Sequence, residues 1–310
     1  MFLGQTLKTV KYTLLVMALG LALVPPAPSC AGQTEKTPYM DELEQKANSG
    51  SGADAYKLGK LHEQKKNYEQ AEHWFRIGLY HDDYLSALGL YQLNENGNRD
   101  IPQAAMYKKL GLSLLHKTAH EDARAAMTLS EAYTYGTYFP VSFEDALAWL
   151  KRAESLGSAE ASYRLGMMYS DGYQVAVDPV RALYYFRRGH EAGEERATRQ
   201  LAVAYATGIG VEKNLQKAKE YFIKAADAGD TLAMRDLGNY FTYHEKNQAQ
   251  AVFWFTKAAE KDNADALYFL GEIYKNTDPA RARAYYTQAV KQKHFYAKVA
   301  LEEQQQAKKK

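Results

Sequence analysis

The chain has 310 residues, of which 46% are hydrophobic and 25% are charged, a balance that supports a packed core and excludes a wholly disordered protein. Its formal net charge is +2 and acidic and basic residues are interspersed, which gives no sign of nucleic-acid binding. The 25 Tyr beside only 8 Pro favour many short helices that each bury a ring.

Residues 1–30 are predicted to be a signal peptide. Lys8 and Lys11 form a basic start, residues 12–24 are an uncharged and mostly apolar run, and two prolines end it. This run is short for a bilayer core of about 30 Å, so export is favoured over a permanent membrane anchor. We expect a bacterial protein of the periplasm or outer membrane, or a secreted one.

Cys30 is the only cysteine and lies at the predicted cleavage junction. Cleavage after Ser29 or after Ala31 would leave small residues at the first and third positions before the cut, as signal-peptide cleavage requires. The junction is also similar to a bacterial lipobox, in which the cysteine is lipidated. Ala27 stands where a lipobox usually has Leu, so lipidation at Cys30 and an ordinary soluble leader both stay open. A lipid at this cysteine is the only membrane attachment that the sequence predicts.

A repeat begins after residues 31–52, which are predicted to be a flexible linker. A leucine followed four residues later by an aromatic recurs along the chain, and from Leu129 to Leu237 its spacing is constant at 36 residues. The aromatic partners in this stretch are Tyr133, Tyr169, Tyr205 and Phe241. The anchor leucines are Leu58, Leu88, Leu129, Leu165, Leu201, Leu237 and Leu270.

A second pattern follows in every unit: a small residue, an aromatic three later, and a small residue four beyond, as in Ala182, Tyr185 and Gly189. Spacings of three and four place the three side chains on one helix face, where a second helix can pack closely. Gly157 and its equivalents, and Asn263 in the sixth unit, are predicted to end the second helix with a positive φ.

These patterns predict an all-α fold, a right-handed α-solenoid of about seven antiparallel helix pairs over residues 53–300. Residues 301–310 are predicted to be a solvated polar and basic tail. The second unit is longer than the others, and we expect residues 115–122 to form an inserted turn or a lengthened helix end.

The unit from Ala197 to Ala233 resembles the Sel-one-like repeat, a tetratricopeptide-like helix pair, and the resemblance extends over about residues 53–300. It implies an α-solenoid with interaction roles in envelope assembly, polysaccharide export or host contact. The residues that carry it are Leu201, Tyr205, Gly208, Gly210, Val211, Lys217, Ala218, Tyr221, Phe222, Lys224, Ala225, Ala226 and Gly229.

A partner is predicted to bind along the concave groove, which the first helix of each pair should line. With the anchor leucines buried, positions two before and two after each leucine should face this groove, where they either bind a protein or peptide partner or are ordinary surface residues. The predicted groove residues are Met127, Glu131, Tyr163, Met167, Arg199, Val203, Arg235, Asn239, Tyr268 and Glu272.

No catalytic motif stands out, and neither a cofactor nor a metal site is expected. His116 and His120 have a spacing that two ligands of one metal can have, but no third ligand is evident. We therefore expect a non-catalytic scaffold. Two alternatives stay open: an envelope hydrolase or peptidoglycan-modifying enzyme with a site across repeats, which a pocket of mutually bonded titratable groups would favour, and a secreted effector that binds host proteins.

Overall fold

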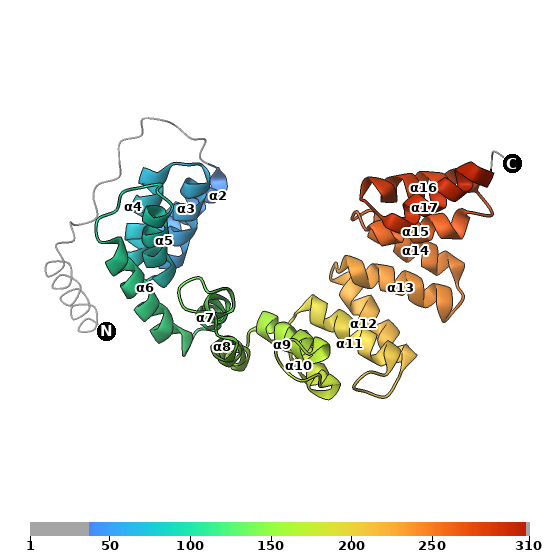
Figure 1. The fold of residues 1–310 in the computed structure, drawn as a ribbon, viewed down its shortest axis with the longest axis horizontal. Coiled ribbons are helices and arrows are strands. Elements are labelled where there is room, and N and C mark those ends of the chain that lie inside the picture. The colour runs from blue at the N-terminus through green and yellow to red at the C-terminus, as the bar shows by residue number, and fades with distance from the viewer. Residues whose placement is uncertain (1–36, 308–310) are drawn as a thin grey trace. The chain divides into compact units, whose positions relative to one another are not determined.

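A computed structural model describes residues 37–307, and within this span sixteen α-helices follow one another with no β-strand (Figure 1). The chain divides into two compact units, one ending at Leu129 and the other beginning at Ser130. The predicted all-α repeat solenoid is confirmed. The helices are α2 (Pro38–Asn48), α3 (Gly52–Gln64), α4 (Tyr68–Tyr80), α5 (Tyr84–Glu95), α6 (Ala104–Ala119), α7 (Ala123–Tyr135), α8 (Phe143–Ser155), α9 (Ala159–Asp171), α10 (Pro179–Glu191), α11 (Glu195–Thr207), α12 (Leu215–Asp227), α13 (Thr231–Tyr243), α14 (Gln248–Ala259), α15 (Ala264–Tyr274), α16 (Pro279–Lys291) and α17 (Phe295–Ala307).

Each repeat is a pair of consecutive helices, here named helix A and helix B. The seven pairs run from α3/α4 to α15/α16, so the A helices are the odd-numbered ones. Every anchor leucine on these A helices is at most 2% exposed. Burying one such side chain stabilises a fold by roughly 1.5–3 kcal/mol, so the leucine spacing identifies the core correctly.

A glycine after the anchor leucine lets a ring of helix B pack directly on the backbone of helix A. A Cβ atom added at Gly166 would lie 2.4 Å from a ring carbon of Phe186, and one added at Gly238 would lie 2.4 Å from a ring carbon of Phe255. No side chain fits in that space. The same relation joins Gly59 with Phe75 and Gly271 with Tyr286.

Two adjacent rings of helix B contact helix A, where the sequence pattern predicted one. Tyr185, the predicted ring, stacks on Tyr169 of its own repeat, with centroids 5.7 Å apart and planes inclined by 7°. The next residue, Phe186, covers Gly166. The predicted packing seam is therefore confirmed but incomplete, because the second ring makes the closest helix contact.

Six of the seven turns after helix B contain a residue with positive φ, as predicted for Gly157 (φ 89°) and its equivalents, and the turn after α6 has none. The prediction for Asn263 is wrong by one position. Asp262 takes the positive φ of 59°, and Asn263 caps α15 by accepting the Ala266 N–H at 2.8 Å. Asn is used here for its side-chain oxygen, which suits a helix N-terminus.

The predicted flexible linker, residues 31–52, is wrong for its second half. Residues 38–48 form α2, which Thr37 caps and Pro38 begins. Met40, Leu43 and Ala47 are buried, and the helix packs against α3. Apolar residues at spacings of three and four are the signature of an amphipathic helix, and this pattern was present in the sequence.

The predicted polar tail, residues 301–310, is also corrected, because α17 continues to Ala307. Ala297 is buried and Leu301, four residues later, is half-buried, the same spacing as Ala233 and Leu237 in α13. The last helix is thus an A helix without a B partner among the described residues.

The extra length of the second repeat is a lengthened helix end, one of the two forms predicted. Helix α6 has 16 residues, whereas the B helices α4, α10 and α12 have 13. Leu115 and Ala119 in the added turn are fully buried. The added turn therefore extends the core of this repeat.

The predicted signal peptide and Cys30 lie outside the described residues and stay predictions. Across residues 37–307, none of the helices combines the length and the apolar character that crossing a membrane requires.

Candidate functional site

All ten residues predicted to line the groove are partly buried and lie on A helices from α7 to α15. Nine of them belong to the second unit, and only Met127 belongs to the first. The second unit therefore holds almost the whole candidate surface. Each helix from α9 to α17 packs on the next one in the chain, and the face that the A helices of this stretch present is called the A face below.

Ion pairs connect one A helix to the next across this face. Arg164 of α9 reaches Glu131 of α7 at 2.9 Å and Glu160 of its own helix at 2.7 Å. Arg196 of α11 contacts the same Glu160 and also Glu194. These groups are between 14% and 46% exposed, so each pair contributes little to stability, and their main effect is to order the face.

A second set of ion pairs surrounds Asp236. Arg199 Nε lies 3.3 Å from Asp230 Oδ2, and its Nη1 lies 3.8 Å from Asp236 Oδ2. Arg235 donates from Nε and Nη2 to Asp236 Oδ1 at 3.0 and 2.7 Å. Burial raises the pKa of Asp236, and Arg235 opposes this rise. The two predicted groove arginines are therefore engaged within the protein, and a partner that uses them must share these carboxylates.

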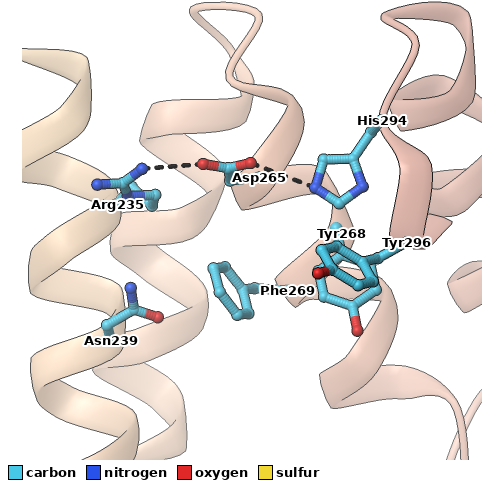
Figure 2. A pocket seen from close by; sticks show the side chains of 7 residues that line it. All are labelled: Arg235, Asn239, Asp265, Tyr268, Phe269, His294 and Tyr296. Atoms are coloured by element: carbon cyan, nitrogen blue, oxygen red, sulfur yellow. Dashed lines mark hydrogen bonds and ion pairs between the residues drawn. The ribbon is translucent and has the colours of Figure 1, made fainter.

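Asp265 joins Arg235 to the last helix. Arg235 Nη1 donates to Asp265 Oδ2 at 2.9 Å, and His294 Nε2 lies 3.2 Å from Asp265 Oδ1 (Figure 2). His294 Nδ1 accepts the Ala297 N–H at 3.1 Å and so caps α17, and its ring stacks on Tyr268 with centroids 5.0 Å apart. Both ring nitrogens of His294 thus face a partner within the protein.

A cavity of about 370 Å³ opens beside this chain of contacts, between α13, α15 and the start of α17 (Figure 2). We call it the terminal pocket. Three of its residues were predicted from the sequence, namely Arg235, Asn239 and Tyr268. The full lining is Arg235, Asn239, Asp265, Tyr268, Phe269, His294 and Tyr296.

The other four lining residues were missed for two reasons. Asp265 and Phe269 lie five and one positions before Leu270, outside the positions assigned to the groove. His294 and Tyr296 belong to the start of an A helix that was not expected. The Ala297/Leu301 spacing was the signal that could have identified this helix.

Among the side-chain polar atoms of the terminal pocket, one is buried without a hydrogen-bond partner in residues 37–307, and it belongs to Asn239. That atom is its side-chain oxygen, Oδ1. Most buried polar atoms in proteins have a partner, so an exception inside a cavity marks a place where a ligand can supply one.

Other predicted groove residues also have intramolecular roles. Glu272 accepts a hydrogen bond from the Tyr286 hydroxyl at 2.6 Å, and burial together with this carboxylate raises the pKa of Tyr286. The Arg196 guanidinium lies 4.5 Å from the centre of the Tyr163 ring. Val203 borders a second, smaller cavity of about 80 Å³. The predicted residues therefore form a structured face and not a single cluster.

His116 and His120 lie at the C-terminal end of α6, and burial and the neighbouring His120 lower the pKa of His116. Among residues 37–307, no group of three or more His, Cys, Asp or Glu side chains gathers where a metal ion could be held.

Comparison with known proteins identifies the repeat. The Sel1 repeat model matches residues 52–82, 123–158, 159–193, 196–230, 231–263 and 264–294, which is well over half of the chain, and it omits the repeat with the lengthened helix. No curated protein matches the sequence.

Two solved structures share the fold. A Sel1 repeat protein from Oxalobacter formigenes is 22% identical with a TM-score of 0.60, over 76% of this chain and 99% of that one. A protective antigen of uropathogenic Escherichia coli, described as displaying an SLR fold, is 22% identical with a TM-score of 0.55, over 84% of this chain and 66% of that one. The chain thus spans slightly less than two thirds of the antigen. By its repeats and its fold, the chain belongs to the Sel1 repeat family, whose members are generally protein-interaction scaffolds with a typically non-catalytic fold.

Proposed function

We propose that the protein is a non-catalytic scaffold of the bacterial cell envelope that binds a peptide or protein partner on the A face of its second unit. The observation that carries the proposal is the terminal pocket, a cavity lined by Arg, Asn and three aromatic side chains on the face predicted from the sequence. Tyr and Arg are enriched at the centres of protein interfaces. The general role of Sel1 repeat proteins supports the same function.

The geometry of the terminal pocket argues against the enzyme alternative. Asp265, His294 and Arg235 do form a chain of mutually bonded titratable groups, the feature that would favour a hydrolase. A general base needs a nitrogen or oxygen that can take a proton from the substrate. His294 directs one ring nitrogen to Asp265 and the other to the Ala297 N–H, so this histidine serves as a helix cap.

The envelope location rests on the leader predicted in residues 1–30, and attachment by lipid rests on Cys30. A secreted effector remains the alternative of a different class. Cell fractionation separates the two, because an envelope scaffold stays with the cell and an effector is released into the medium.

Crosslinking and affinity purification from intact cells test the proposal. We expect the unchanged protein to co-purify with a partner from the envelope fraction and the Tyr163→Ala/Tyr268→Ala variant to lose it. Both tyrosines lie on the A face, and truncating an aromatic hot spot typically costs about 2 kcal/mol or more of binding free energy. The partner is identified by mass spectrometry in each fraction.

The matched control is Tyr184→Ala/Phe253→Ala, which removes two exposed rings from the B helices α10 and α14. This variant should retain the partner. All three proteins must show the same helical circular dichroism signal. Equal loss of the partner in both variants, or in neither, would refute binding through the A face.

A further inference from the structure

The charged groups of the terminal pocket bind one another and leave no free charge for a ligand. Arg235 directs its donors to Asp236 and Asp265. Asp265 uses one carboxylate oxygen for Arg235 and the other for His294. A ligand carboxylate would be repelled by Asp236 and Asp265, which already share Arg235. A ligand cation would be repelled by the Arg235 guanidinium close by. The pocket therefore favours an uncharged group.

Asn239 presents the polar atom that still needs a partner. It follows Arg235 by about one turn of α13, so both side chains lie on the same wall of the pocket, one helical turn apart (Figure 2). A buried acceptor without a donor costs about 1–3 kcal/mol, and a ligand N–H that reaches Oδ1 recovers part of this cost.

The rest of the wall is aromatic. Tyr268, Phe269 and Tyr296 line the cavity, and Tyr296 is 62% exposed at its rim. Aromatic rings bind a further ring well, in edge-to-face or offset-stacked contact. About 370 Å³ is at the small end of ligand pockets, so the space fits one large side chain and its backbone.

We propose that the terminal pocket binds an internal, extended segment of the partner protein, with an uncharged aromatic side chain packed against the wall that Tyr268, Phe269 and Tyr296 form and a backbone N–H donated to Asn239 Oδ1. This proposal rests on the proposed function and names the chemistry that the A face recognises. It assigns contact with the partner to Phe269, Asn239 and Tyr296, and an indirect, positioning role to Asp265 and His294.

The probe is N-acetyl-tryptophan amide, which carries an aromatic ring between two uncharged amides. It is titrated into the purified full chain, and binding is followed by NMR at the Asn239 side-chain amide and the Phe269 and Tyr296 backbone amides. We expect saturable shifts at these positions. N-acetyl-tryptophan, which ends in a carboxylate, and N-acetyl-glycine amide, which has no ring, should both bind several-fold more weakly.

Two substitutions separate the hydrogen bond from the shape of the pocket. Asn239→Leu keeps the number of side-chain heavy atoms and the branching point but removes the acceptor, and it should weaken binding about three- to tenfold, as expected for one hydrogen bond. Asn239→Asp keeps an acceptor oxygen at the same place and should bind more tightly than the Leu variant. Tyr296→Ala changes only an exposed ring, so it tests the aromatic wall even if a change at Asn239 disturbs the fold.

The proposal is overturned if the probe causes no shift in the pocket, if Asn239→Leu binds it as tightly as the unchanged protein, or if the carboxylate probe binds more tightly, which would indicate a site for a chain terminus. These results with the probe do not test the proposed function, which depends on retention of the cellular partner. If the cellular partner is retained through the A face while the probe does not bind, only the assignment of the pocket is lost.

Discussion

Replacing Gly238 by Leu is expected to lower the free energy of unfolding by about 3 kcal/mol, the upper part of the range for overpacked cores. The backbone at Gly238 packs under the Phe255 ring, where even a Cβ atom would lie 2.4 Å from a ring carbon. The loss occurs although leucine is a better helix former than glycine by about 1 kcal/mol. Urea unfolding followed by tryptophan fluorescence measures the effect.

Two controls show that the ring contact is the cause. Phe255→Ala added to the Gly238→Leu variant should recover part of the loss, because it removes the ring that the new side chain displaces. Tyr243→Leu introduces leucine at a 66% exposed position of the same helix and should leave stability nearly unchanged. A Gly238→Leu protein as stable as the unchanged one would show that the assigned packing of α13 on α14 is wrong.

Replacing both Arg199 and Arg235 by Met is expected to lower the free energy of unfolding by about 3 kcal/mol. The change leaves Asp236, whose side chain is only 15% exposed, without its two cationic neighbours. Removing the partners of a buried charge typically costs about 3–5 kcal/mol, and the partial exposure of Asp236 places the expectation at the lower end. Unfolding by urea at neutral pH measures it.

The stability that the same variant loses should depend on pH and on the charge of the side chain at position 236. Burial raises the pKa of Asp236 above its unfolded value, and loss of the arginines raises it further. The native variant then binds this proton more tightly than the unfolded chain does. Its deficit in free energy of unfolding is therefore largest at neutral pH and shrinks as the pH falls through the pKa of Asp236. Asp236→Asn in the same background should remove the part of the deficit that comes from this carboxylate, while the part from Asp230, which also loses Arg199, should stay. A deficit that is the same at every pH and persists in full with Asn would contradict the role given to this carboxylate.

The sequence predicted the repeat well because its signal depends on local spacing. Leu165 and Leu237 are fully buried, as the 36-residue period indicates. The contact of Phe186 with Gly166 was not predicted, because two adjacent aromatic residues offer two choices for the buried ring and spacing alone does not decide between them. The relative position of helices A and B decides it.

The candidate site could be predicted only in part. Arg235, Asn239 and Tyr268 follow from the helical period, whereas His294 and Tyr296 reach the pocket because α17 packs on α15. The sequence also did not show that Arg199 and Arg235 are engaged by aspartates, since Asp230 caps α13 and Asp265 lies in the first turn of α15, positions at which an aspartate is expected for the helix start alone. Such contacts between repeats depend on the three-dimensional stacking.

Site-specific photocrosslinking in intact cells tests the central claim, binding through the A face, most directly. A benzophenone amino acid is placed at Tyr296, at the rim of the terminal pocket, and in separate proteins at Tyr184 and Phe253 on the B helices. All three side chains are exposed, between 46% and 62%, so each probe can reach a neighbouring molecule. We predict one protein adduct of defined mass from position 296 and none of that mass from the other two. An adduct of the same mass from the B helices, with none from position 296, would contradict binding through the A face.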